Sequence, residues 1–188
     1  PVMLSSSVQA SLTGRFGGSE YGRSKKAGEE LFFQYGHEVG ARMLIYRFPN
    51  LFGKWCRPNY NSAIATFCNN IANDLPIQVN DRNVEMELLY IDDLVDEMIS
   101  ALVGKEHRCE FEGLEVIPAV EGHYCYCPVT HKTTLGEIVD IISECAASVS
   151  PAGGKAQTAL ALPQGSLEYK LMTTYLSYLP KEKVIIDL

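Results

Sequence analysis

The stretch GGSEYGRSKKAGEELFF, residues 17–33, decides the fold class of this chain. It places Tyr21 and Lys25 at positions i and i+4, and apolar or small residues then recur at close to helical spacing. We therefore expect a helix over residues 20–38, on which Tyr21 and Lys25 share one face. A short apolar run that ends in serines, residues 1–7, precedes it and is typical of a buried parallel strand.

The rest of the chain continues this alternation of strand and helix. We expect strands at residues 41–48, 76–79, 84–91 and 122–129, and helices at 62–74, 92–103 and 133–149. Thr134 and Glu137 have the spacing of a capping box, and Ser62 can cap the helix that follows it. The fold class is therefore predicted to be α/β, with a parallel sheet and flanking helices.

Composition narrows the class of protein. Of 188 residues, 46% are hydrophobic and 21% are charged, a balance typical of soluble globular proteins. The net charge of -7 argues against a nucleic-acid partner or an anionic membrane surface. No apolar run approaches the roughly 18 residues of a membrane span. We therefore expect no nucleic acid and no membrane among the partners.

The six cysteines show no paired disulfide spacing, which predicts a reducing, cytoplasmic setting. Zinc-capable residues do gather in one part of the sequence: His107, Cys109, His123, Cys125, Cys127 and His131. Structural zinc sites usually use Cys-x-x-Cys spacing, which is missing here, and cysteine is a common buried residue. We therefore expect no metal site.

The Tyr21–Lys25 spacing suits a specific kind of chemistry. An ammonium beside a phenol stabilises the phenolate, so the phenol can exchange a proton with a carbonyl or alcohol oxygen. The accompanying hydride must come from a nicotinamide cofactor, because no side chain supplies one. One of Ser5, Ser6 or Ser7 could hold the same oxygen. The alternative is a solvated helix surface, but the serine-ended strand, glycine-rich loop and later strand in this order favour catalysis.

Four segments, LSSSVQ (4–9), YGRSK (21–25), YRFPNLFG (46–53) and LLYIDDLVDEM (88–98), resemble the extended short-chain dehydrogenase/reductase family. Further segments at 49–68, 77–85, 133–142 and 173–180 are similar to the reductase domain of the CapF-type capsular polysaccharide enzymes. The resemblance implies the C-terminal part of a Rossmann-type domain with a small mixed substrate-binding region. It also implies an NADP cofactor (NAD possible), a UDP-sugar substrate and a homodimeric parent.

The implied reaction reduces a 4-keto UDP-N-acetyl-6-deoxy-sugar to UDP-2-acetamido-2,6-dideoxy-L-talose. The resemblance assigns residues 1–60 and 88–102 mainly to the Rossmann part, and 60–87 and 104–188 mainly to the substrate-binding part. A glycine-rich dinucleotide turn and a cupin domain are expected outside these 188 residues, so we expect the chain to be inactive by itself.

The resemblance also implies roles for single residues. Tyr21 is expected to be the general acid that protonates the sugar C4 oxygen. Lys25 is expected to stabilise the phenolate form of Tyr21 and to hydrogen-bond the nicotinamide ribose hydroxyls. Ser7 is expected to provide the hydroxyl that orients the substrate carbonyl. The turn after the second strand is expected to hold the cofactor and the sugar. It places Phe48, Pro49 and Leu51 near the cofactor and Asn50 near the substrate.

Other candidates rest on chemistry alone. Arg57 and Arg82 could meet a diphosphate and Asn61 the substrate, and each could equally be a surface residue. Trp55 and Asn59 belong to the same loop. Asp92 and Asp93 resemble paired catalytic carboxylates, but we expect them only to begin a helix, where the dipole favours acids.

Two other functions remain open. A nucleotide-sugar 4-epimerase would share the fold and the Tyr–Lys pair but would use tightly held NAD. A 4,6-dehydratase is disfavoured, because Val8 and Gln9 stand where acidic residues would be expected. The alternative from another class is a non-catalytic binding module on a dehydrogenase fold.

Overall fold

A computed structural model describes residues 1–108, 122–149 and 162–183 of the chain. It separates into two compact units, which are described one at a time. The first unit comprises Pro1–Pro49 with Asp93–Val129, and the second comprises Asn50–Asp92 with Thr130–Leu188.

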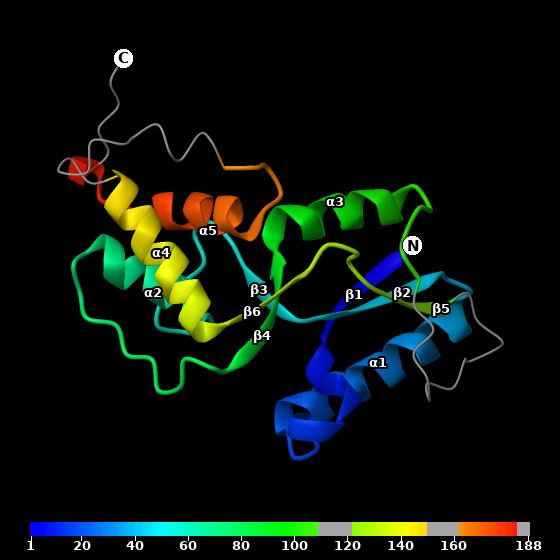
Figure 1. Cartoon of the computed structure of the whole chain (residues 1–188). Coiled ribbons are helices and arrows are strands. Elements are labelled where there is room, and N and C mark those ends of the chain that lie inside the picture. The colour runs from blue at the N-terminus through cyan, green and yellow to red at the C-terminus, as the bar shows by residue number, and fades with distance from the viewer. Residues whose placement is uncertain (109–121, 150–161, 184–188) are drawn as a thin grey trace. The chain divides into compact units, whose positions relative to one another are not determined.

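The first unit is built on a parallel sheet with strand order β1-β2-β5 (Figure 1). In chain order it contains β1 (Val2–Ser7), the 3-10 turns η1 (Val8–Ser11) and η2 (Gly14–Phe16), α1 (Glu20–Val39), β2 (Met43–Phe48), most of α3 (Ile91–Leu102) and β5 (Gly122–Cys125). β1 and β2 are in register from Val2 opposite Met43 to Ser7 opposite Phe48. The predicted α/β class with a parallel sheet is confirmed.

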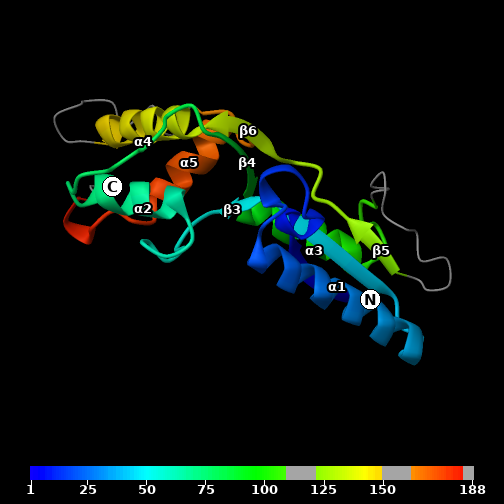
Figure 2. The ribbon, with the colours of Figure 1, turned by 90° about the horizontal axis from the view of Figure 1, so that it is seen from below.

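Helix α1 packs against β1 and β2, as two views at right angles show (Figures 1 and 2). Its buried Phe33 meets Met43 and Ile45 of β2 in a small apolar cluster. Ser19 caps the beginning of the helix, and Gly40 ends it in the left-handed conformation (φ 65°) that glycine adopts easily. The buried residues of α1 are Gly22, Glu29, Phe33 and Gly36, whereas Leu31 and Tyr35 are exposed. The apolar spacing of the sequence therefore predicted the helix but not the face that it buries.

The second unit has a mixed sheet with strand order β3-β4-β6. Its elements are β3 (Asn50–Phe52), α2 (Ala63–Ala72), β4 (Glu85–Tyr90), β6 (His131–Thr134), α4 (Leu135–Val149), α5 (Leu167–Leu176) and the 3-10 turn η5 (Lys181–Lys183). β3 runs parallel to β4, whereas β6 runs antiparallel to it.

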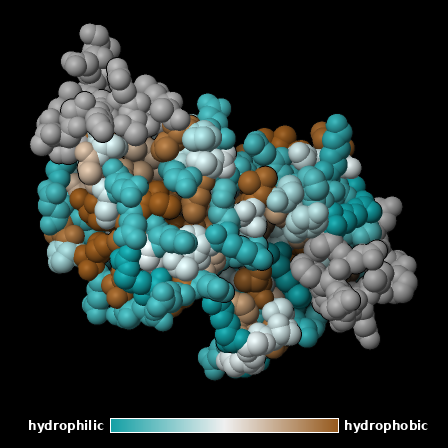
Figure 3. Space-filling view, in the orientation of Figure 1, coloured by the Kyte–Doolittle hydropathy of each residue, from teal (hydrophilic) through white to brown (hydrophobic). Residues whose placement is uncertain are grey.

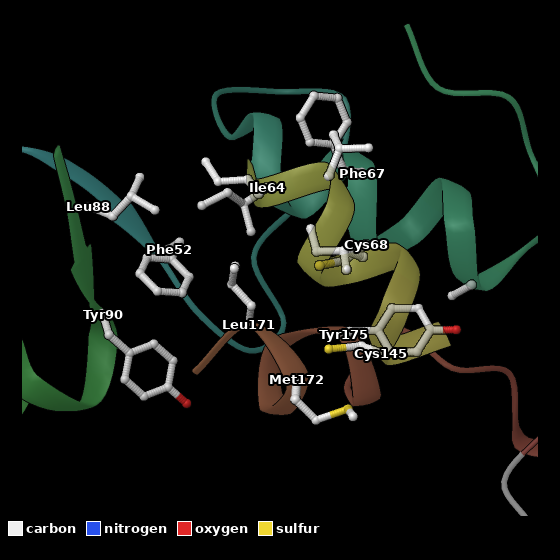
Figure 4. Packing of buried hydrophobic residues seen from close by; sticks show 14 residues of the cluster. Phe52, Ile64, Phe67, Cys68, Leu88, Tyr90, Cys145, Leu171, Met172 and Tyr175 are labelled. Carbon is white, nitrogen blue, oxygen red and sulfur yellow. The ribbon is translucent and has the colours of Figure 1, made fainter. Parts of the chain in front are cut away.

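A larger hydrophobic core fills the second unit (Figure 4). Helices α2, α4 and α5 contribute Cys68, Cys145 and Leu171 to it, and Phe52 and Tyr90 come from the sheet. The members of this core that are fully buried are Cys68, Ala72, Leu88, Ile138, Ile142 and Leu171.

The sequence predicted most long elements but not all short ones. The strand expected at 76–79 is wrong: these residues form no strand, although Ile77 and Val79 pack on the core of the second unit. Strands β3 and β6 and helix α5 were not predicted. β5 ends at Cys125, before the expected end at residue 129.

No helix in the described ranges is long and apolar enough to cross a membrane. On the face shown in Figure 3, hydrophobic and hydrophilic residues are interspersed.

Candidate active site

Tyr21 and Lys25 lie on the first two turns of α1, next to β1. The Nζ of Lys25 lies 5.6 Å from the centroid of the Tyr21 ring. It also donates a hydrogen bond of 3.1 Å to the carbonyl oxygen of Ser5 in β1. Tyr21 is 53% exposed, so its phenol is accessible to a ligand. The structure thus brings the predicted pair together and fixes its lysine on the neighbouring strand.

The beginning of α1 is held against the turn that follows β1. Ser19 accepts a hydrogen bond from the backbone nitrogen of Gly22 (2.9 Å) and donates one to Oε1 of Gln9 (2.8 Å). A Cβ atom at position 22 would lie 2.3 Å from the carbonyl oxygen of Gln9. Only glycine therefore lets the helix approach η1 this closely, and Tyr21 is the residue before it.

The three serines of β1 have different surroundings. Ser6 is buried, and its hydroxyl donates to Oε1 of Glu29 at 2.5 Å. Ser5 and Ser7 belong to the other face of the strand, because side chains alternate. The Ser7 hydroxyl accepts a hydrogen bond from the backbone nitrogen of Gln9 (3.2 Å). A hydroxyl that accepts can still donate its own proton, as the role predicted for Ser7 requires.

The end of β2 carries two more candidates of the first unit. Phe48 lies opposite Ser7 in the sheet register. Its ring is buried and stacks on Tyr46 with a centroid distance of 5.8 Å, and Pro49 follows it. Ser7 and Phe48 therefore mark the carboxyl ends of two adjacent parallel strands, the edge at which open α/β sheets bind ligands.

Three candidates of the second unit make contacts within that unit or line a pocket. The Nδ2 of Asn50 donates to the carbonyl oxygen of Glu87 (3.0 Å). Arg57 is exposed, and its guanidinium lies 5.4 Å from the ring centroid of Tyr60. Asn61 lines a pocket of about 780 Å³. Neighbouring lining residues are Asn59, Tyr60, Gln78, Asn80 and Asp81.

The remaining two second-unit candidates are Leu51 and Arg82. Leu51 is 38% exposed on β3. Arg82 is held by an ion pair, because its Nη2 lies 2.7 Å from both carboxylate oxygens of Asp140. The same nitrogen donates to the carbonyl oxygen of Gly136 at 3.2 Å. A diphosphate would therefore compete with Asp140 for this guanidinium.

A buried ion pair lies one turn beyond Lys25, and the sequence reasoning missed it. Glu29 is fully buried and accepts hydrogen bonds from Arg47 Nε (2.9 Å), Arg47 Nη2 (2.5 Å) and Tyr124 OH (3.1 Å), in addition to Ser6. Burial and then the charge of Glu29 raise the pKa of Tyr124 to about 12, so this phenol stays protonated and donates. The signal was present in the sequence, because Arg47 is a charge inside the otherwise apolar MLIYRF strand.

Comparison with protein families matches residues 8–110 to the NAD dependent epimerase/dehydratase family. The chain belongs to this family. Its predicted membership of the extended short-chain dehydrogenase/reductases is thereby confirmed. Tyr21 and Lys25 lie inside the matched range.

Relatives with known functions match the chain over different lengths. A UDP-2-acetamido-2,6-beta-L-arabino-hexul-4-ose reductase of Pseudomonas aeruginosa is 37% identical over 187 residues, which is 100% of this chain and 44% of that protein. UDP-glucuronate 4-epimerase 1 of Arabidopsis thaliana is 34% identical over 88 residues, which is 45% of this chain and 20% of that protein.

Solved structures also match nearly the whole of this chain but only part of their own chains. The capsular polysaccharide assembling protein CapF of Staphylococcus aureus superimposes with a TM-score of 0.75 and 43% identity, over 98% of this chain and 44% of that one. The UDP-glucose 4-epimerase of Thermus thermophilus in complex with NAD has a TM-score of 0.63 at 16% identity, over 94% of this chain and 63% of that one, which shows the fold alone. The chain thus spans less than half the length of the Pseudomonas and Staphylococcus relatives.

The acidic residue Asp92 and two of the zinc-capable histidines contact other side chains. Asp92 forms an ion pair with Lys54 (3.0 Å), and this hydrogen bond raises the pKa of Lys54. His107 pairs with Glu97 (2.6 Å), and His131 lies 2.9 Å from the Nζ of Lys170. Within residues 1–108, 122–149 and 162–183, no three His, Cys, Asp or Glu side chains form a metal-binding group. Cys109 lies outside the described residues.

Proposed function

We propose that this chain carries the catalytic Tyr–Lys pair and the sugar-nucleotide pocket of an NADPH-dependent reductase. The substrate is a 4-keto UDP-N-acetyl-6-deoxy-sugar, and the product is UDP-2-acetamido-2,6-dideoxy-L-talose. The observation that carries this proposal is the position of the Lys25 Nζ, between the Ser5 carbonyl and the Tyr21 ring. The name of the Pseudomonas relative, a 4-ulose reductase matched over the whole chain, supports the substrate class.

The residues of the first unit suit a nicotinamide cofactor. An ammonium has three donors, and Lys25 gives one to Ser5, which leaves two for ribose hydroxyls. Phe48 and Pro49 border the same strand ends, and Leu51 is proposed to line the nicotinamide. A reduced nicotinamide supplies the hydride when it is bound. NADP is the form proposed, and NAD is the alternative.

In this mechanism, residues of the chain orient the substrate and transfer the proton. Ser7 donates a hydrogen bond to the substrate carbonyl and orients it. Tyr21 gives its proton to the C4 oxygen as negative charge develops there. The ammonium of Lys25 stabilises the phenolate that remains. Because Tyr21 is about half exposed, its proton is restored from water.

The pocket of the second unit suits the nucleotide part of the substrate. It is lined by residues that include Asn59, Asn61, Gln78 and Tyr60. Amides match the donor and acceptor edge of a uracil, and an aromatic face can stack on it. We propose that Arg57 and Asn50 contact the diphosphate and the sugar, with Arg82 as a further candidate for the diphosphate.

The test is Tyr21→Phe in the full-length protein, assayed by NADPH oxidation with the 4-keto UDP sugar. Loss of a general acid should lower kcat by roughly 10²- to 10⁴-fold. Tyr35→Phe is the matched control, because Tyr35 is an exposed tyrosine of the same helix (55%) and belongs to no part of the proposed site. Full activity of Tyr21→Phe would sink the proposal.

A 4-epimerase is the second candidate, favoured by the family match and the Arabidopsis relative. The two reactions differ in their redox balance. A reductase consumes one NADPH for each sugar, whereas an epimerase returns its hydride and consumes none. Product formation without net oxidation of NADPH would therefore support the epimerase.

A further inference from the structure

We propose that Glu29 and Arg47 are positioning residues that set the register of α1 against β1, and so hold Lys25 and Tyr21 in place for the proposed reaction. Together with their partners Ser6 and Tyr124 they are called the Glu29 network. This inference rests on the proposed function. It adds two residues that touch neither substrate nor cofactor in the mechanism above.

The first argument is the spacing along α1. Tyr21, Lys25 and Glu29 stand at i, i+4 and i+8, so they share one face of the helix. Lys25 bonds the carbonyl oxygen of Ser5, and Glu29 accepts from the hydroxyl of Ser6, the next residue of the strand. Two successive turns of the helix are thus tied to two successive residues of β1. A slide of α1 along the strand would break both links.

The second argument is direction. Arg47 approaches Glu29 from the adjacent strand β2 with two nitrogens, Nε to Oε1 and Nη2 to Oε2. Such a two-point contact fixes the rotation of the carboxylate as well as its distance. The phenol of Tyr124 on β5 donates to the same carboxylate. The helix is therefore fixed by every strand of the first unit's described sheet, whereas its apolar contacts are non-directional.

The third argument is burial. The side chain of Glu29 is 0% exposed and that of Arg47 is 6% exposed. Replacing a buried ion pair by apolar residues of similar size is often neutral or stabilising, so stability alone is a weak reason for such a pair. Fixing one packing arrangement among several is a better one. The pair is also neutral as a whole, so it orients the helix without adding net charge near Lys25.

The decisive variant is therefore Glu29→Leu combined with Arg47→Met, in the full-length protein. The substitution removes both charges together, so the electrostatic field at Tyr21 changes little, while the directional links are lost. We expect cooperative thermal unfolding to persist and kcat to fall about 10-fold or more, because small misplacements of catalytic groups are costly. The KM for the UDP sugar should change little, since the pocket proposed for its nucleotide part is made of second-unit residues.

The split between kcat and KM separates positioning from a merely structural role. Tyr21 and Lys25 act in the chemical step, so their misplacement should lower kcat and leave the KM for the UDP sugar nearly unchanged. A variant that is only less stable would keep the wild-type kcat per folded molecule at temperatures well below its Tm.

Arg47→Lys provides a second, gentler arm in case the double variant does not fold. It keeps the charge and loses the two-point contact. We expect a smaller loss of kcat, again with little change in KM. Glu30→Gln is the control, an exposed acid on the same helix, and should match wild type in both readouts.

Two outcomes are decisive and distinguishable. If a folded double variant, or Arg47→Lys, keeps the wild-type kcat, the positioning role is overturned while the proposed function stands. If Tyr21→Phe also keeps full activity, the proposed function itself fails.

Discussion

At position 22 two effects of an added methyl group oppose each other. Alanine in a helix interior is favoured over glycine by about 1 kcal/mol. Yet the Cβ of Gly22→Ala would lie 2.3 Å from the backbone oxygen of Gln9, which cannot move aside as a side chain can. Overpacking of this kind costs about 1–3 kcal/mol. We therefore expect Gly22→Ala to lower both the free energy of unfolding and kcat, since Tyr21 precedes it.

Gly28→Ala on the same helix is the matched control. A Cβ at Gly28 would meet nothing within 4 Å. Here only the helix propensity should count, so the free energy of unfolding should rise by roughly 0.5–1 kcal/mol. Urea titrations of the two variants compare them directly. If both variants were stabilised, the close approach of α1 to η1 would be wrong.

Single residues were predictable where their chemistry shows in the spacing. Tyr21 and Lys25 were found from their i, i+4 relation, which the structure brings into contact. Glu29 obeys the same spacing but was not singled out, because an acid on a helix is ordinarily solvated. Its burial depends on Arg47, which reaches it from another element. The charge of Arg47 in an apolar strand indicates that a buried partner exists, but no local pattern in one sequence identifies that partner as Glu29.

Among the elements, the start of α4 gives a clear test. Thr134 Oγ1 accepts from the backbone nitrogen of Glu137 (3.2 Å), and the Glu137 carboxylate accepts from the backbone nitrogen of Thr134 (2.9 Å). The predicted capping box is confirmed. Thr134→Ala should lower the free energy of unfolding by about 1 kcal/mol, measured by urea titration. An unchanged midpoint would contradict the cap.

The same cap predicts a dependence on pH. The hydroxyl of Thr133 and then the backbone of Thr134 hold the pKa of Glu137 below its usual range. A lowered carboxyl pKa contributes stability above the unfolded pKa of about 4.3, and this is lost as pH falls through the folded value. Wild type should therefore lose more stability in this acid range than Glu137→Gln does. Equal losses of stability in wild type and Glu137→Gln would show that the Glu137 carboxylate does not contribute to this pH dependence.

Elements with long apolar periodicity were predictable, and short or mixed ones were not. The sequence predicted α1, α2, α3 and α4 because each has a continuous helical pattern. β6 was missed because its sequence, HKTT, is polar and lacks the apolar alternation of a strand. It is a strand because it pairs with β4. Helix α5 contains aromatic and β-branched residues that weaken the helical signal. In the segment PIQV (76–79), Ile77 and Val79 alternate with other residues because both pack on the hydrophobic core. The segment was predicted as a strand for this reason, but it does not pair with one.

At the scale of the whole molecule, each unit has buried cysteines that can report on it separately. Cys68 and Cys145 lie in the core of the second unit, and Cys125 and Cys127 are buried in the first. Cys56 is only partly buried. Since each unit contains its own buried cysteines, alkylation followed by peptide mass spectrometry can measure the local unfolding of each unit separately.

Among the five cysteines that the structure describes, Cys56 is expected to be the first to react in native alkylation at pH 8. The thiolate is the reactive form. Burial raises the pKa of Cys145 to about 11, and burial also raises that of Cys68, so both remain protonated thiols at this pH. With increasing urea, Cys68 and Cys145 should become reactive together, because they belong to one hydrophobic cluster. Alkylation of Cys145 at the rate of Cys56 without urea would show that the α2–α4 contact is open in solution.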